Sequence, residues 1–257
     1  PEAYYFPPQV NNHGGDFPYT FFGITPGTTK EQILECLKNF TKGDNKITNY
    51  SSAFRLEPGT GWDVPPGMLH APGSMCTYEP QKASDVFAMY QSLVNEAIIP
   101  EELLWNGTPQ DRMGDYNQLM EVIDWELNTN PNLLETRFMA PVVINPETSE
   151  GYEEKWICYR SHDFSAKELT VMPGQTVTIK DNAAYGMIMM QGHGTMGEWN
   201  IETPTMIRYG QLTQDEYFVS EAAAKEGVKI VNQSATDPIV MLKHFGPKNP
   251  DLPIDIM

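Results

Sequence analysis

Short β-type runs separated by glycine and proline turns recur along most of this sequence, and they limit the folds that it can adopt. The 257 residues include 20 glycines and 21 prolines. Residues 168–172, 176–179, 187–190 and 228–231 are runs of this kind, with turns such as Pro173-Gly174 and Tyr209-Gly210 between them. Strands at such close spacing predict an all-β sandwich or barrel.

The pattern divides the chain into two β-rich halves with a helical segment between them. We expect a first barrel over residues 1–97, a helical connector over 98–150, a second barrel over 151–247 and a C-terminal tail over 248–257. A cap at Thr28 or Thr29 and an apolar stripe that includes Ile33 and Leu37 predict an inserted helix at about 29–40. The connector has apolar residues at helical spacing, namely Tyr116, Leu119, Met120, Ile123 and Leu127.

Charge and cysteine content restrict the partners and the compartment. The formal net charge is −17, from 34 acidic and 17 basic residues, and this charge repels phosphate backbones and anionic lipid heads. We therefore expect a small-molecule substrate, and neither nucleic acid nor a membrane as a partner. Three widely spaced cysteines favour free thiols and a cytoplasmic location.

The segment from Gly59 to Ser74 carries the most specific motif. Gly59, Pro65, Gly67 and His70 follow the spacing Gly-x5-Pro-x-Gly-x2-His. Pro65 and Gly67 predict a sharp turn, after which a strand points the imidazole of His70 into the mouth of a barrel. The pattern resembles the second motif of the cupin superfamily, with Ser74 where that motif has Asn. The resemblance implies a bicupin of two jelly-roll barrels, distantly similar to phosphomannose-isomerase-like cupins, with His70 as a metal ligand.

A second segment resembles part of the first cupin motif. Asn11 stands where the family has its first His, His13 where it has the second, and Asp16 where it has Glu. Gly23 follows Asp16 by seven residues, as in the family, and Gln9 is an alternative to Asn11. Together with the histidine of the second motif, these residues imply a mixed site for one divalent transition metal, Zn, Mn, Fe or Ni. The alternative that His13, beside two glycines, is only a turn residue stays open.

Four further side chains are candidates for the same site. Glu79 follows the second motif closely and could act as a ligand or as a general base, with a solvated residue at the rim as the alternative. Trp62, Tyr19 and Tyr78 would supply an aromatic and polar lining that suits a carbohydrate or a small hydroxy acid.

The second half resembles a cupin barrel without its ligands. Lys180 and Asn182 stand where the two histidines of the first motif belong. His193 is expected at a hairpin tip, and His244 is expected past the last strand, which the pattern places at 239–242. We therefore expect a metal-free second barrel that serves packing, covers the first site or supports a homodimer.

Three functions agree with these features. A metal-dependent enzyme with isomerase or lyase chemistry on a small carbohydrate-like or hydroxy-acid substrate is preferred, because a divalent metal polarises carbonyl groups. A non-catalytic cupin that binds a sugar or another small molecule is the first alternative, since the altered first motif is typical of a lost site. An Fe(II) dioxygenase is the second alternative.

Overall fold

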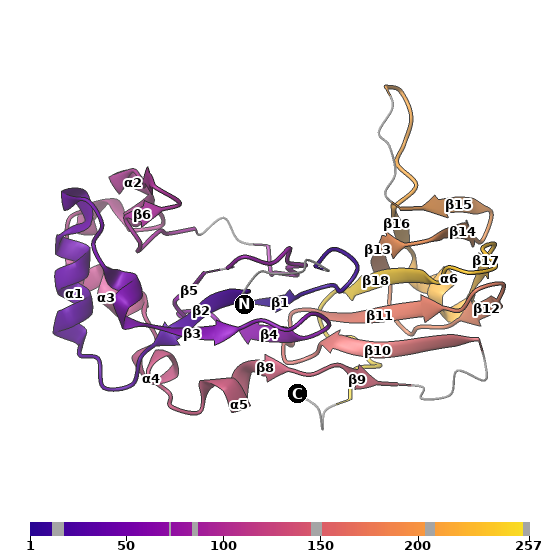
Figure 1. Cartoon of the computed structure of the whole chain (residues 1–257), viewed down its shortest axis with the longest axis horizontal. Helices are drawn as coiled ribbons and strands as arrows, with labels where there is room; N and C mark the ends of the chain where they lie inside the picture. Colours follow the sequence, from indigo (N-terminus) through magenta and orange to yellow (C-terminus); the bar gives the residue numbers. More distant parts are fainter. Residues whose placement is uncertain (12–17, 72, 84–86, 145–150, 204–208, 254–257) are drawn as a thin grey trace.

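The computed structural model describes residues 1–11, 18–71, 73–83, 87–144, 151–203 and 209–253, and these form two β lobes side by side along the long axis (Figure 1). The first lobe ends near residue 140 and carries most of the helices at the end far from the second lobe (Figure 1). Strands exceed helices over the whole chain, 34% against 19%, and this confirms the all-β class and the two jelly-roll barrels. No helix within the described ranges is long and apolar enough to cross a membrane.

Two three-stranded antiparallel sheets and a short hairpin form the first lobe. One sheet has the order β1-β4-β8, and the other has the order β3-β2-β5. The hairpin pairs β6 with β7. The strands are β1 (Glu2–Tyr5), β2 (Tyr19–Ile24), β3 (Ser51–Arg55), β4 (Gly61–Val64), β5 (His70–Ala71), β6 (Leu93–Val94), β7 (Ala97–Ile98) and β8 (Phe138–Met139).

Strand β1 contributes to the cores of both lobes. Successive side chains of a strand point to opposite faces. Tyr4 and Phe6 therefore pack in the core of the first lobe, whereas Ala3 and Tyr5 pack in the core of the second. The Tyr5 hydroxyl also donates a hydrogen bond to Glu168 Oε2 of the second lobe over 2.6 Å.

Several helices pack together at the outer end of the first lobe (Figure 1). The predicted inserted helix is present as α1 (Lys30–Lys38), and Thr29 and Gln32 cap it reciprocally. The expected connector packs against this helix instead of lying between the lobes, so Leu37, Leu104 and Leu119 share one core. The remaining helices are α2 (Glu101–Leu104), α3 (Tyr116–Val122), α4 (Trp125–Asn128) and α5 (Leu133–Arg137), with 3-10 turns at Phe40–Lys42, Ile47–Tyr50 and Gln110–Arg112.

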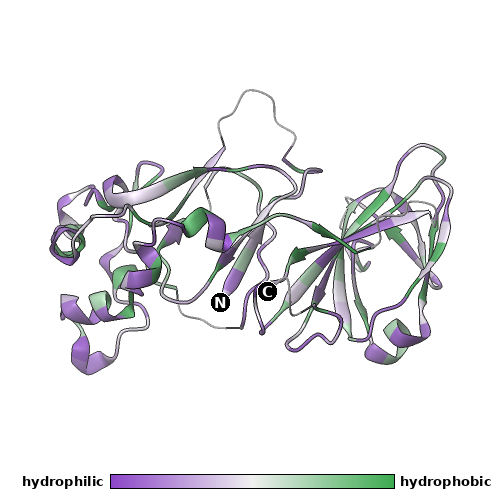
Figure 2. Ribbon diagram, turned by 90° about the horizontal axis from the view of Figure 1, so that it is seen from below, coloured by the Kyte–Doolittle hydropathy of each residue, from purple (hydrophilic) through white to green (hydrophobic). Residues whose placement is uncertain are grey.

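The second lobe packs a six-stranded sheet on a four-stranded sheet. The six-stranded sheet has the order β16-β13-β18-β11-β10-β9, and the four-stranded sheet has the order β12-β17-β14-β15. Apolar residues recur along these strands, which stand apart from the first lobe in Figure 2. The elements are β9 (Val142–Val143), β10 (Tyr152–Cys158), β11 (Ser165–Val171), β12 (Thr176–Ile179), β13 (Tyr185–Gln191), β14 (His193–Met196), β15 (Trp199–Glu202), β16 (Glu216–Val219), α6 (Glu221–Glu226), β17 (Val228–Asn232) and β18 (Ile239–Phe245).

Four charged side chains are buried inside the second barrel. Asp181 places one carboxylate oxygen 2.7 Å from Lys167 Nζ and the other 2.7 Å from Lys243 Nζ. Glu154 lies 2.5 Å from Lys243 and 3.4 Å from Lys167. The two lysines face each other across paired strands β11 and β18. This cluster, which we call the ion-pair quartet, occupies part of the barrel interior.

Two histidines of the second lobe differ in position from the expectation. His193 begins β14 directly after Gly192, whose φ of +88° turns the chain from one sheet to the other, so it lies at a corner and not at a hairpin tip. His244 lies within the last strand, because β18 extends to Phe245 along β11 and β13. The expectation that His244 follows the last strand was wrong. Side chains alternate between the two faces of a strand, so a polar histidine on the outer face of β18 does not end the strand.

Candidate functional site

Residues 78–82 form an extra pairing along the free edge of β1. The amides of Ala3 and Tyr5 donate to the carbonyls of Pro80 and Tyr78 over 3.0 and 2.9 Å, and the amide of Tyr78 donates back to Tyr5 over 2.8 Å. Because neighbouring residues of an extended segment point to opposite sides, Tyr78 faces the second lobe. Glu79 faces the first lobe, on the same side as Tyr4.

The turn before His70 has the form that the motif predicted. Gly67 has a φ of +79°, and a Cβ at this position would lie 3.0 Å from Asp124 N and Val122 O. Its carbonyl accepts hydrogen bonds from Asp124 N and from Asn128 Nδ2, over 3.0 and 2.7 Å. A glycine is required here because a side chain would tolerate neither the dihedral angle nor the close backbone. The turn delivers His70 to strand β5, where it pairs with Phe22 of β2.

His70 is held at both ring nitrogens. Nδ1 lies 2.9 Å from the carbonyl oxygen of Met68, and since a carbonyl only accepts, Nδ1 carries a proton. Nε2 lies 2.6 Å from Glu2 Oε1. The side chains of His70 and Glu2 are 26% and 19% exposed, so solvent reaches both.

Glu79 completes a chain of three titratable groups with Glu2 in the middle. The two carboxyl groups share a hydrogen bond, and this arrangement requires a proton between them. Burial, together with the hydrogen bond and the charge of Glu2, raises the pKa of Glu79 to about 7. Burial alone would raise the pKa of Glu2, but hydrogen bonds from His70 and Glu79 lower it below its ordinary value.

The pKa of His70 is raised although burial opposes its protonation, because Glu2 accepts its hydrogen bond and supplies a negative charge. At neutral pH the group therefore holds a hydrogen-bonded His70–Glu2 pair beside a carboxyl group that is close to half-protonated. A carboxyl group with a pKa near the working pH can both take and return a proton. We call Glu2, His70 and Glu79 the proton-relay site.

The donor groups of the proton-relay site fit a metal ion only in part. The proton-relay site contains an imidazole and two carboxylates, which are ligand types for a divalent transition metal. Across the described residues, however, no three His, Cys, Asp or Glu side chains are arranged to hold one. Two of the expected ligands, His13 and Asp16, lie outside the described residues, and their roles stay predictions.

The two amides near the start of the chain differ in their bonding. The side chain of Asn11 accepts from Cys76 N and donates to the carbonyls of Pro7 and Cys76, over 2.8 to 3.0 Å, so it holds two loops together. Gln9 has a buried side-chain oxygen without a hydrogen-bond partner among the described residues. Of the two, Gln9 is the better ligand candidate, since its oxygen is not already committed to the backbone.

The three predicted aromatic residues lie in three different environments. Trp62 is 1% exposed and stacks on Phe22 with 4.5 Å between ring centroids, so it is part of the core and presents no surface to a substrate. Tyr19 is 43% exposed at the start of β2. Tyr78 faces the second lobe, away from the proton-relay site. The structure therefore joins His70 and Glu79 and separates them from these aromatic residues.

Glu2 is the functional residue that sequence reasoning missed. It begins the run Glu2-Ala3-Tyr4-Tyr5-Phe6, in which Tyr4 and Phe6 face the core of the first lobe. Glu2 lies two residues before Tyr4 and four before Phe6, so in an extended segment it shares their face. This pattern predicts a carboxylate on the inward face and could have identified Glu2. The partner of that acid was not predictable, since His70 is far away in the sequence.

The raised pKa of Glu79 predicts how stability depends on pH. The folded protein binds this proton up to about pH 7, whereas the unfolded chain releases it near the ordinary value of 4.5. Stability therefore falls as the pH rises through this window. Glutamine keeps a neutral donor toward Glu2, so Glu79→Gln should lose less thermal stability than the parent between pH 5 and pH 8. Thermal unfolding of the parent and of Glu79→Gln at both pH values measures this, with the exposed Glu135→Gln as control. The prediction is contradicted if the variant and the parent lose the same stability between the two pH values.

Comparisons with solved structures identify the kind of fold. A point variant of phosphomannose isomerase from Salmonella typhimurium has a TM-score of 0.56 at 10% sequence identity, and the match covers 96% of this chain and 66% of that one. A mannosephosphate isomerase candidate from Archaeoglobus fulgidus has a TM-score of 0.55 at 9% identity, with 96% of this chain and 60% of that one covered. Both are proteins of the cupin type.

The similarity has clear bounds. This chain spans 60 to 66% of the length of these two structures. No family model matches the sequence, and no curated protein matches it either. Sequence identities of 9 and 10% show a shared fold and leave substrate and reaction to be argued from the site.

Proposed function

Because this chain is a two-barrel protein with the cupin fold, we propose that it is a metal-dependent isomerase for a small hydroxylated carbonyl compound such as an aldose. The observation that carries the proposal is Glu79, a partly buried carboxyl group with a pKa of about 7 that is linked through Glu2 to His70. The fold similarity to the two isomerase structures supports the same reaction class.

The reaction needs one proton to move between adjacent carbons. Glu79 in its carboxylate form takes the proton from the carbon next to the carbonyl group, and the electron pair of that C–H bond forms a carbon–carbon double bond. The π pair of the carbonyl group moves to its oxygen, which takes up the proton of the neighbouring hydroxyl group, so an enediolate results. The oxygen that lost its proton then forms the new carbonyl group, and the electron pair of the carbon–carbon double bond takes the proton from Glu79 at the former carbonyl carbon, which converts an aldose into a ketose. Glu2 keeps the pKa of Glu79 in the range where both steps proceed, through its hydrogen bond and its charge.

A divalent metal belongs to the proposal as a second component. His70, as the neutral imidazole and in place of its hydrogen bond to Glu2, would hold it through Nε2, together with His13, Asp16 and either Gln9 or Asn11. When bound, such an ion polarises the carbonyl group of the substrate. The cytoplasmic location and the homodimer stay predictions.

Metal content tests this component directly. We expect about one divalent transition metal per chain in the purified protein and its loss in His70→Ala, because no other described imidazole faces the first barrel. Elemental analysis of both proteins provides the measurement. The control is His193→Ala, which removes an exposed imidazole of the second lobe and should leave the metal content unchanged. Retention of the metal by His70→Ala contradicts the assignment.

The reaction itself is tested by solvent exchange. Aldoses such as mannose and glucose, and their 6-phosphates, are incubated with the metal-loaded protein in heavy water, and NMR follows deuterium at the carbon next to the carbonyl group. Proton transfer by Glu79 predicts deuterium in both the substrate and the ketose product. Binding of a sugar without exchange would instead support a non-catalytic cupin, and consumption of oxygen would support a dioxygenase.

A further inference from the structure

Strand β16 forms a free edge of the second lobe. It is the terminal strand of the six-stranded sheet and pairs with β13 alone within the described part of the chain. The amide of Met189 donates to the carbonyl of Asp215 over 2.7 Å, just before β16 begins. Since the direction of the backbone groups alternates from residue to residue in an antiparallel pair, the N–H and C=O groups of Glu216 and Phe218 point away from β13. These groups face the open edge of the sheet.

The outward backbone groups of this edge are available to a partner. Across the described ranges, no hydrogen bond joins the amide or the carbonyl of Glu216 or Phe218 to an element other than β13. Proteins usually protect such an edge with charged side chains, bulges or a covering segment. Phe218, however, is 76% exposed, so β16 presents a large apolar side chain beside unpaired backbone groups. This combination is typical of an edge that accepts a further strand.

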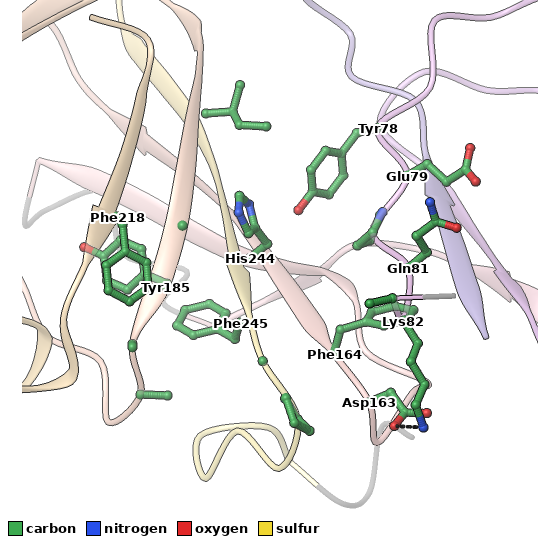
Figure 3. Close-up of a pocket in the computed structure, with 18 of the residues that line it drawn as sticks. Tyr78, Glu79, Gln81, Lys82, Asp163, Phe164, Tyr185, Phe218, His244 and Phe245 are labelled. Atoms are coloured by element: carbon green, nitrogen blue, oxygen red, sulfur yellow. Dashed lines mark ion pairs between the residues drawn. The ribbon is translucent and has the colours of Figure 1, made fainter. Parts of the chain in front are cut away.

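A cleft of about 1030 Å³ lies beside β16, between the outer face of the sheet and the first lobe (Figure 3). Phe218 and Ile188 line the wall that the sheet forms, and the segment 77–83 lines the opposite wall. Successive side chains of an added strand would alternate between the two faces of the sheet. Those on the outer face would lie beside Phe218, on the side of the cleft. An apolar side chain opposite Phe218 would therefore be partly removed from water.

The charge of this edge selects the partner. Glu216 is exposed, and none of the ion pairs within the described ranges includes it. Lys82 of the cleft and Lys225 of α6 are already paired with Asp163 and Glu221. A basic side chain opposite Glu216 would thus meet a carboxylate without a counter-ion. A second copy is the poorer occupant, because its own Glu216 and its net charge of −17 would be repelled.

We propose that β16 binds an extended peptide of a basic partner protein as an additional antiparallel strand, with an apolar side chain opposite Phe218 and a lysine or arginine opposite Glu216. Both side chains project from the same face, so they stand two residues apart in the peptide. The same two peptide residues exchange backbone hydrogen bonds with Phe218 and Glu216, and these bonds supply the affinity. The side chains supply the specificity.

Fluorescence anisotropy with a short labelled peptide tests this proposal. The probe is rhodamine-Thr-Leu-Thr-Lys-Thr-amide, in which the leucine is placed opposite Phe218 and the lysine opposite Glu216. The full-length protein should bind the probe. The same peptide with glutamate in place of lysine should bind at least about 5-fold more weakly, because attraction to Glu216 becomes repulsion.

Methylation of the peptide backbone distinguishes strand pairing from attraction between side chains. The amides of the leucine and the lysine face β16 in the proposed pairing. N-methylation of both removes two hydrogen bonds and should weaken binding by about 10-fold or more. The matched control carries N-methyl groups on the two threonines that flank the lysine. Their amides face away from β16, so this peptide should keep most of its affinity.

Variants of the protein locate the site. Phe218→Ala should weaken binding of the probe by about 3- to 5-fold, and Glu216→Lys should reverse the preference in favour of the glutamate peptide. Both replaced side chains are exposed, so thermal unfolding should stay close to that of the parent. The control is Trp199→Ala, which removes a 66% exposed aromatic side chain from β15 of the other sheet and should leave binding unchanged.

The outcomes separate this surface from the proposed isomerase. His70→Ala should bind the probe like the parent, whether or not the protein isomerises a sugar. The proposal is overturned by an absence of probe binding, by equal affinity of the two N-methylated peptides, or by an unaltered preference in Glu216→Lys. A dimer of the parent in analytical ultracentrifugation that dissociates in Phe218→Ala also overturns it, since a second copy would then occupy the edge.

Discussion

Replacement of Asp181 by asparagine is expected to lower the free energy of unfolding by about 3–5 kcal/mol, the usual cost of removing one partner from a buried ion pair. Asp181 accepts from both Lys167 and Lys243, one through each carboxylate oxygen. The amide of asparagine offers one acceptor and turns a donor toward the other lysine. The two lysines would then share the single carboxylate of Glu154, so one positive charge of the cluster would be uncompensated, in a place where the side chains of Asp181 and Lys243 are both 0% exposed.

The size of the effect follows from burial. Burial alone would raise the pKa of Asp181, but the charges of Lys243 and Lys167 lower it below its ordinary value of 3.8. A lowered pKa means that this carboxylate stabilises the fold above about pH 4 and that its contribution is lost as the pH falls. The Asp181→Asn variant should therefore differ most from the parent at neutral pH and less in acid.

Urea unfolding at neutral pH measures the change. The matched control is Asp44→Asn, which breaks a pair with Lys46 at the surface, where the lysine side chain is 64% exposed. Exposed pairs of this kind contribute little to stability because water and salt screen their charges, so the control should unfold close to the parent. Equal stability of the two variants would show that the quartet is not a tightly coupled network.

Glu79→Gln is expected to reduce the rate of isomerisation by about 10²- to 10⁴-fold, the range found when a general base is removed. Glutamine is nearly the same size and can donate a hydrogen bond to Glu2, so the local fold should persist. In the parent, the activity should rise with pH through about 7 as Glu79 loses its proton, and this rise should be absent from the variant. Initial rates from pH 5.5 to 8.5 provide the measurement.

Glu2→Gln separates positioning from catalysis at the same site. Glu2 raises the pKa of Glu79 through a hydrogen bond and through its charge. An amide has no charge, so the pH at which activity rises should move below 7 while part of the activity is retained. The exposed Glu135→Gln should leave both rate and pH profile unchanged. A pH profile identical to that of the parent in Glu79→Gln would remove Glu79 from the proposed mechanism.

Local sequence determined the elements that depend on near neighbours. The spacing of Ile33 and Leu37, with a cap at Thr29, defined helix α1, because helix formation depends on residues within one or two turns. Gly67 defined the turn before His70, since only glycine adopts a φ of +79° without strain. Alternating strands and frequent turns were likewise sufficient for the all-β class.

Local sequence patterns gave wrong predictions for segments whose position depends on contacts with distant residues. The apolar spacing from Tyr116 to Leu127 predicts one helical stretch, but the chain breaks at Ile123 and continues as α4. Asp124 caps α4 through Leu127 N, and its own amide donates to Gly67 of the turn before His70. A contact with a loop more than fifty residues away sets this break, so no local pattern reveals it.

The candidate site was also only half determined by the sequence. His70 followed from its motif, but the carboxylate of Glu2 reaches it only because β1 and β5 lie in sheets that fold over the same core. Glu79 and Tyr78 are neighbours in the chain, and only the pairing of their segment with β1 sends one to the proton-relay site and the other toward the second lobe. Motifs record which side chains a turn or strand presents. The packing of strands that lie far apart in the sequence decides which distant groups contact these side chains. It therefore also decides which groups share a proton with them.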